Sequence, residues 1–251
     1  MDGTLGDPVL EAPSTELQFL KSQPPKERSS RGLVVMLVVG ALVFVGALLW
    51  RPVVHGLLGG GHSYEFIAID PANGDPVTWD HCMAIRYMVN PEGAPENWRQ
   101  MVGDAFDDIA KHSGFVFVDA GETRNRVINN TWSPGQKRGE PILIIWSSQG
   151  RIHSLQGNTV GLGGGASIKV DGRTRLVTGR IALDSEAHSR TYDPISEIDQ
   201  RMILEHEIGH VLGLDHVSDP RQLMAASYTG QAGLGKGDIS GLKKLHAVPC
   251  G

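Results

Sequence analysis

The sequence of 251 residues predicts an α/β domain over residues 63–251, preceded by a single transmembrane helix. Three observations support this fold class. Segments rich in β-branched and aromatic residues alternate with segments of helical periodicity along residues 63–251. No internal repeat interrupts that order. Ahead of it stands a run of 19 uncharged, almost wholly apolar residues.

The composition fits a folded domain and excludes two other classes of protein. Hydrophobic residues make up 40% of the chain and charged residues 20%, which is enough apolar surface for a core. The net charge of −5 offers no basic surface, so no nucleic-acid partner is expected. Two cysteines exclude both a disulfide-rich scaffold and a four-cysteine zinc ribbon.

The first 62 residues predict a tail, a membrane anchor and a stalk. Residues 1–31 are rich in Pro, Ser, Glu and Lys and have no apolar period, which predicts a disordered tail. Residues 32–50, GLVVMLVVGALVFVGALLW, would span about 28 Å as a helix, close to the ~30 Å hydrocarbon core of a bilayer. Residues 51–62 contain several glycines and predict a flexible stalk.

The charges that flank the apolar run predict its orientation. Lys21, Lys26, Arg28 and Arg31 precede it, and only Arg51 follows closely. The positive-inside rule therefore predicts a single-pass cell-membrane protein with a cytoplasmic tail and a monomeric, extracellular domain. A cleaved signal peptide and a buried core helix are the alternatives. The length of the run and the 31-residue leading tail favour the anchor.

The first half of the domain reads as strands with one helix. Four segments carry the apolar and aromatic residues typical of strands: 63–70, 83–90, 115–119 and 142–146. Residues 95–113 show apolar spacing of i, i+3, i+4 and i+7, and Gly114 can end that helix. Asp171-Gly172 can turn a hairpin between strands over 167–170 and 174–183.

Two helices complete the predicted order. The first has two candidate starts: Asp193-Pro194, with proline at the first helical position, and Ser196, which can form a capping box with Asp199. This helix carries apolar residues at helical spacing and ends at Gly213. The second, shorter helix begins near Asp238.

The penultimate helix contains the motif HEIGHVLGLDH, residues 206–216. His206 and His210 are four residues apart, so their imidazoles stack on one face and can reach a single Zn²⁺. Gly213 lets the chain reverse, which brings His216 back as a third ligand. Three neutral histidines leave one position open, as in catalytic zinc sites. Glu207 lies beside the first ligand, where it can act as a base without binding the metal.

This motif resembles the metzincin signature H-E-x-x-H-x-x-G-x-x-H, and its Gly-Leu-Asp-His ending is similar to the matrixin branch. The segment SDPRQLMAASY places Met224 where matrixins have their Met-turn. Residues 234–247 resemble the matrixin C-terminal helix, and residues 79–95 are similar to the first strand of bacterial matrixin-like proteins. The resemblance covers residues 76–247.

The resemblance implies a twisted mixed sheet with one antiparallel edge strand, an active-site helix and a C-terminal helix. It also implies a zinc-dependent endopeptidase in which Glu207 moves a proton from the attacking water to the leaving amine. An extended peptide substrate would lie along the edge Gly161–Ile168, with Gly161, Gly163 and Ala166 as contacts. Tyr228 is expected to line the pocket for the side chain after the cleaved bond, or else to be a packed surface aromatic.

Two departures from the matrixin pattern concern metals and latency. Arg180 and Ala182 stand where the family's structural zinc site has an acid and an imidazole, so no second zinc is expected. Asp184 and Glu186 remain as candidate ligands for Ca²⁺. No cysteine-switch motif is present, and residues 52–75 are too few for a prodomain.

Two functions compete with the membrane-anchored peptidase: an inactive scaffold serving as a binding or sensory ectodomain, and a zinc hydrolase of cell-wall peptides. The intact Glu207 favours an active enzyme.

The predicted topology places Cys82 and Cys250 on the oxidising side of the membrane, which favours a disulfide. Cys82 as a latency ligand of the zinc, or two inert thiols, are the alternatives.

Overall fold

A computed structural model describes residues 15–19, 63–128, 140–188 and 195–251, and all of these belong to one compact unit. The predicted anchor over residues 32–50, the stalk and most of the tail lie outside the described residues. Within the described ranges, no helix combines the length and the apolar character needed to cross a bilayer.

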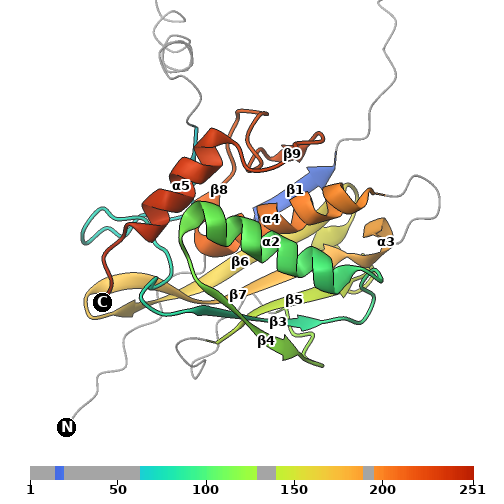
Figure 1. Ribbon diagram of the computed structural model, residues 1–251, viewed down its shortest axis with the longest axis horizontal. Helices are drawn as coiled ribbons and strands as arrows, with labels where there is room; N and C mark the ends of the chain where they lie inside the picture. The colour runs from blue at the N-terminus through green and yellow to red at the C-terminus, as the bar shows by residue number, and fades with distance from the viewer. Residues whose placement is uncertain (1–14, 20–62, 129–139, 189–194) are drawn as a thin grey trace, which may run out of the picture. The chain divides into compact units, whose positions relative to one another are not determined.

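A mixed sheet forms the centre of the domain, with strand order β4-β3-β5-β7-β6-β1-β9 (Figure 1). Strands β3, β4, β5 and β7 are parallel, and β6 runs antiparallel to β7. The mixed sheet is the predicted architecture, but the antiparallel strand β6 is not its edge, because β1 and β9 lie beyond it. The strands span Thr15–Phe19 (β1), Ile85–Asn90 (β3), Phe117–Glu122 (β4), Ile142–Ser147 (β5), Thr159–Val170 (β6), Arg173–Asp184 (β7) and Ser227–Tyr228 (β9).

The β6–β7 hairpin is the longest pairing in the sheet. Asp171 and Gly172 turn it with φ values of 48° and 82°, the positive angles that a type I′ turn requires. The predicted hairpin is therefore confirmed, but β6 begins at Thr159 rather than at Ser167. β6 is longer because the glycine-rich residues, which belong to the predicted substrate edge Gly161–Ile168, are extended and pair with β7.

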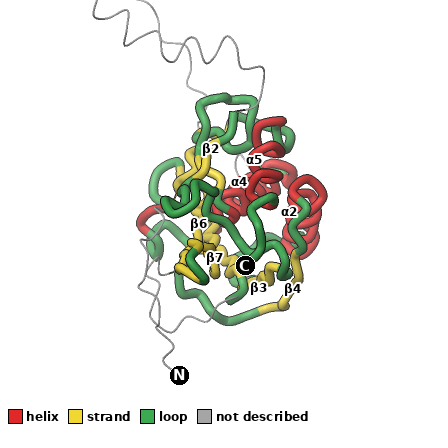
Figure 2. The backbone as a smooth tube through the Cα atoms, turned by 90° about the vertical axis from the view of Figure 1, so that its left-hand side faces the viewer, coloured by secondary structure: helices red, strands yellow, loops and turns green. Residues whose placement is uncertain are grey.

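Helices α2 (Trp98–Ser113) and α4 (Glu197–Leu212) pack on one face of the sheet, with α5 (Lys236–His246) beside them (Figures 1 and 2). The main core lies between these helices and the sheet, and it includes Phe106, Ile109, Ile144, Ile181 and Ile208. A smaller core lies on the other face, under the 3-10 helix η1 (His153–Leu155), and contains Leu143, Ile145, Leu155, Leu162 and Ala182. Strand β5 is buried on both faces, as expected for a central parallel strand. The short helix α3 (Ser185–His188) follows β7.

Two predicted strands have different bounds in the structure. The segment 63–70 contributes only β2 (Glu65–Phe66), which pairs with β8 (Leu214–Asp215) in a separate two-stranded sheet. Its continuation turns because the Asp70 carboxylate accepts hydrogen bonds from the backbone N–H groups of Ala72 and Thr174. The segment 115–119 becomes β4 two residues later, after the left-handed turn at Gly114.

Strand β1 lies within the residues for which the sequence predicts a disordered tail. It pairs antiparallel with β6 and parallel with β9. A strand that adds to an open sheet edge is held by its backbone, so it needs no hydrophobic period. Composition and periodicity therefore carry no signal for it.

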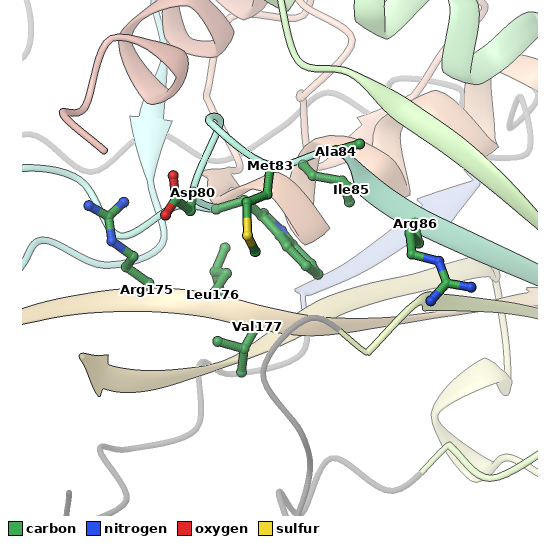
Figure 3. Close-up of a pocket in the computed structure, with 9 residues that line it drawn as sticks. Asp80, Met83, Ala84, Ile85, Arg86, Arg175, Leu176 and Val177 are labelled. Atoms are coloured by element: carbon green, nitrogen blue, oxygen red, sulfur yellow. The ribbon is translucent and has the colours of Figure 1, made fainter. Parts of the chain in front are cut away.

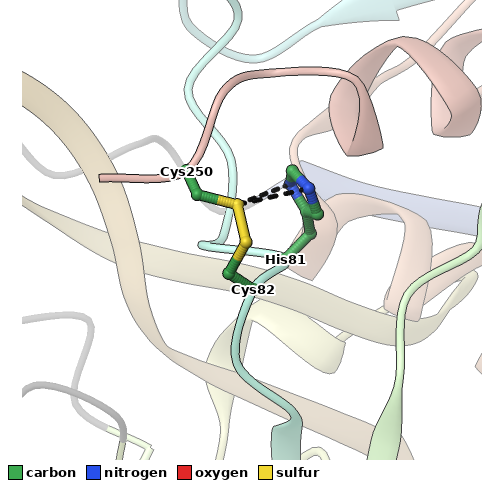
Figure 4. A group of neighbouring side chains, drawn as sticks. All are labelled: His81, Cys82 and Cys250. Carbon is green, nitrogen blue, oxygen red and sulfur yellow. Dashed lines mark hydrogen bonds between the residues drawn. A yellow bond between two sulfur atoms is a disulfide. The ribbon is translucent and has the colours of Figure 1, made fainter.

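Cys82 and Cys250 form a disulfide, with Cα atoms 5.9 Å apart (Figure 4). This is the favoured one of the three predicted arrangements. It joins the residues before β3 to the end of the chain, 168 residues later. The ring of His81 lies against this bond, with Nε2 3.3 Å from Cys250 Sγ.

Reduction of this disulfide is expected to lower the melting temperature by roughly 5–15 °C. The chain-entropy model gives a loop of this length an upper stabilisation of about 5 kcal/mol, and about 1 kcal/mol moves the midpoint of a domain of this size by ~2–4 °C. Thermal unfolding with and without a dithiol measures the change. The double variant Cys82→Ser/Cys250→Ser is the control, because its midpoint should not respond to the dithiol. An unchanged midpoint in the reduced wild type would contradict the stabilising role.

Candidate metal centre

Helix α4 begins and ends at residues that fix its length. Of the two predicted starts, the structure has Ser196, whose Oγ accepts a hydrogen bond from the Asp199 N–H at 3.2 Å. Gly213 ends the helix with a φ of 116°. A Cβ at this position would lie 2.6 Å from the carbonyl oxygen of Val77. The conformation and the contact both require glycine, so the chain reverses here and leads into His216.

The three predicted histidines converge on one point. The Nε2 atom of His210 lies 2.9 Å from that of His206 and 3.2 Å from that of His216, and the remaining pair is 3.1 Å apart. The Nδ1 atoms of His206 and His210 lie 2.7 and 2.8 Å from the carbonyl oxygens of Leu223 and Leu214. Carbonyls only accept, so each Nδ1 donates and each Nε2 carries a lone pair.

This arrangement fits a zinc ion. Lone pairs at such distances repel one another unless a cation lies among them. Tetrahedral Zn–N bonds of 2.0–2.1 Å place neighbouring nitrogens about 3.3 Å apart, close to the observed separations. Burial lowers the pKa of His206 to about 3 and the pKa of His210 well below its ordinary value, which keeps both imidazoles neutral. The triad could therefore hold one metal ion.

Glu207 is the polar group beside the triad without an internal partner. It is fully buried, and burial raises the pKa of its carboxyl well above the ordinary value. Neither carboxylate oxygen has a hydrogen-bond partner among the described residues. Such a group is costly, and groups of this kind cluster at functional sites.

Gly161 and Gly163 on β6 make room for Glu207. A Cβ on Gly161 would lie 2.5 Å from the Glu207 Oε1 atom, and a Cβ on Gly163 would lie 2.5 Å from the Glu207 backbone oxygen. The sequence interpretation assigned these glycines to close approach by a substrate. In the structure their missing side chains allow the close approach of α4. Ala166 pairs with Thr178, further along the same strand.

Met224 packs against helix α4 at Gly209, next to the candidate ligand His210. A Cβ on Gly209 would lie 2.5 Å from its Sδ atom, so the thioether fits against the helix backbone next to His210. Asp238, at the start of α5, accepts hydrogen bonds from the N–H groups of Leu223 (2.6 Å), Met224 (3.3 Å) and Gly235 (2.7 Å). Because Leu223 also binds His206, Asp238 orients a candidate ligand indirectly.

The sequence pattern places Asp238 at the start of a helix. It is completely buried, and burial raises the pKa of its carboxyl although the three N–H donors oppose that shift. A helix-capping aspartate has the same sequence pattern whether it is exposed or buried. The local sequence could therefore not reveal that Asp238 also orients His206 through Leu223.

Replacing Asp238 with Ala is expected to weaken metal binding about 10–100-fold, the usual cost of losing a group that orients a ligand. It should also lower the free energy of unfolding by about 3 kcal/mol, because three N–H groups lose their acceptor. Competition with a chromophoric zinc chelator and denaturant unfolding measure the two effects. Asp104→Ala, at an exposed position on α2, is the control. Equal metal affinity in both variants would show that Asp238 does not help to orient the metal ligands.

Tyr228 is buried rather than a surface aromatic. Its side chain is 3% exposed, and its hydroxyl donates a hydrogen bond to Asp199 Oδ1 at 2.5 Å. Burial and the neighbouring Asp199 raise the pKa of this hydroxyl. Tyr228 lies on β9, opposite Phe19 of β1. Strand β1 therefore lies between β9 and β6.

The candidate calcium ligands Asp184 and Glu186 are not part of the histidine cluster, and Asp184 is already hydrogen-bonded within the protein. Asp184 is buried, and its carboxylate accepts hydrogen bonds from Gln149 Nε2 and from the Glu186 N–H. Within the described ranges, the only other set of three clustered metal-ligating side chains is His81, Cys82 and Cys250. The sulfur atoms of that set are bonded to each other, which leaves no thiolate to bind a metal.

A small pocket lies apart from the metal centre, between the segment before β3 and strand β7 (Figure 3). Asp80 and Arg175 extend toward each other from these two elements, and Met83 and Leu176 face the space between them. None of the predicted catalytic, metal-binding or substrate-contact residues lines it.

Comparisons with known proteins agree with this geometry. The family model described as Matrixin matches residues 78–247. A stretch of 62 residues is 40% identical to Metalloendoproteinase 1 of Glycine max, which amounts to 23% of this chain. The match spans 20% of that relative's own length.

Proposed function

The chain belongs to the matrixin family, and from this we propose that it is a zinc-dependent endopeptidase with His206, His210 and His216 as metal ligands and Glu207 as general base. The convergence of three histidine Nε2 atoms beside a buried, unpartnered carboxyl is the observation that carries this proposal. When bound, zinc would polarise the scissile carbonyl and acidify the attacking water.

The residues of the chain supply the remaining parts of the reaction. The raised pKa of Glu207 makes its carboxylate a stronger base for the proton of the attacking water. The resulting carboxylic acid can then donate that proton to the leaving amine. The backbone of Leu223 holds His206 in the required tautomer. An extended peptide could pair with the side of strand β6 that β1 occupies in the structure, which supports a peptide or protein substrate.

We also propose attachment to the cell membrane through residues 32–50, with the peptidase domain outside the cell. The apolar run and the lysines and arginines before it support this localisation. Protease treatment of intact cells should then remove residues 63–251. Protection of the domain until the cells are lysed would reverse the topology.

Digestion of a peptide library by the zinc-loaded full chain tests the proposed activity. We expect internal peptide bonds to be cleaved, a chelator to stop the reaction, and added Zn²⁺ to restore it. Glu207→Gln protein prepared in parallel identifies any contaminating peptidase. A full chain that binds zinc but cleaves nothing would favour the binding scaffold instead. Cleavage restricted to cell-wall peptides would favour the narrower hydrolase.

A further inference from the structure

Residues Thr15–Phe19 occupy a position between two strands of the domain. Thr15, Glu16, Leu17 and Gln18 lie opposite Gly163, Leu162, Gly161 and Thr159 of β6, in antiparallel register. On its other side, β1 runs parallel to β9, with Gln18 opposite Ser227 and Phe19 opposite Tyr228. The backbone of this segment therefore adds an inner strand to the sheet.

This position is directly beside the proposed catalytic group. Leu17 and Thr15 pair with Gly161 and Gly163, the two β6 residues that lie against Glu207. Helix α4, which carries His206, Glu207 and His210, lies next to β1 (Figure 1). The partner on the far side, β9, follows the Met-turn. The segment thus runs along the edge where an extended peptide would have to bind to reach Glu207 and the metal.

We propose that residues 15–19 are a built-in occupant of the peptide-binding edge and compete with peptide substrates for it. This inference rests on the proposed peptidase function for its consequence, but the pairing itself does not. An edge strand presents a row of unpaired N–H and C=O groups that only one added strand can satisfy. Substrate and residues 15–19 therefore exclude each other.

The tether makes the competition effective. Residues 20–62 join β1 covalently to the rest of the domain, so the segment competes within the same chain, at an effective concentration of about 1 mM. If its affinity for the edge is about 0.1 mM, within the range of enzyme KM values, the occupied fraction is about nine-tenths. The apparent KM for a peptide substrate would then be raised about tenfold.

A proline in the strand tests the proposal in the full chain, purified in detergent. Leu17→Pro removes one N–H and disfavours strand pairing, and it replaces no residue of the proposed catalytic machinery. We expect KM to fall about tenfold with kcat unchanged. Val9→Pro, in the same tail outside β1, is the matched control and should behave as wild type. A synthetic peptide of residues 14–21 should inhibit Leu17→Pro competitively.

Hydrogen exchange provides a readout that does not depend on activity. The amides of β6 that point toward β1 are protected only by β1, whereas those that point toward β7 keep their partners. In Leu17→Pro, exchange should therefore rise in peptides covering Thr159–Gly163 and stay unchanged in β7. The Val9→Pro control should show wild-type exchange throughout.

The outcomes separate the two proposals. If Leu17→Pro shows faster hydrogen exchange in β6 but no variant cleaves peptides, the proposal for residues 15–19 stands and the proposed peptidase function is wrong. Cleavage that is equally fast in all variants, with unchanged β6 exchange, would retain the peptidase and overturn the occupant. Cutting of the wild-type chain within residues 15–19 would also overturn it, because the segment would then be a substrate and not a standing competitor.

Discussion

Glu207→Gln is expected to lower kcat for peptide hydrolysis about 10³-fold while zinc stays bound. An amide has nearly the same shape as the carboxyl but cannot accept the proton of the attacking water, and general acid–base catalysis contributes roughly 10²–10⁴-fold. The fully buried position leaves little room for another group to replace it. Single-turnover kinetics and metal analysis of the same sample measure both quantities.

Glu205→Gln is the matched control for this prediction. Glu205 is the preceding buried carboxyl on the same helix, and burial raises its pKa to about 8, but it faces Arg201 rather than the triad. Its kcat should stay near that of the wild type. A folded Glu207→Gln protein without metal would make Glu207 a ligand and would contradict the assignment of the base.

His210→Ala is expected to weaken zinc binding roughly a hundredfold and to abolish turnover. Binding energies of about 10 kcal/mol for zinc sites, shared among three ligands, give a loss of about 3 kcal/mol, or roughly a hundredfold in zinc affinity. The Nε2 atom of His210 lies 2.9 Å from that of His206 and 3.2 Å from that of His216, so its removal leaves only two of the three proposed ligands. Titration against a chelator of known affinity measures the change.

His153→Ala provides the comparison, because His153 is exposed on η1 and outside the triad. That variant should retain wild-type zinc affinity and activity. If His210→Ala also kept its zinc, the metal would have to bind elsewhere, and the assignment of the centre would be wrong.

The sequence predicted those parts of the centre that depend on local spacing. His206, Glu207 and His210 lie on one helix, where a separation of four residues fixes their relative positions. Gly213 revealed the reversal because few other residues adopt its backbone angles. Most helices and central strands followed from their periodicity in the same way.

The parts that could not be predicted depend on contacts between distant segments. Gly161 and Gly163 leave space for Glu207 of α4. This contact exists only in the folded domain, where the helix lies on the sheet. The bond from Asp238 to Leu223 joins residues 15 positions apart in different elements. Strand β1 is set by backbone pairing, to which side-chain patterns contribute almost nothing.

The pairing of β1 requires residues 15–19 and the rest of the domain to lie on the same side of any membrane. A strand can join a sheet only when both are on the same side of a bilayer. If residues 32–50 span a membrane, residues 15–19 and 63–251 lie on opposite sides, and β1 cannot form. Insertion into a membrane would then be the event that empties the peptide-binding edge. We expect the wild-type chain to show a lower KM in reconstituted vesicles than in detergent, with Leu17→Pro giving the same low KM in both.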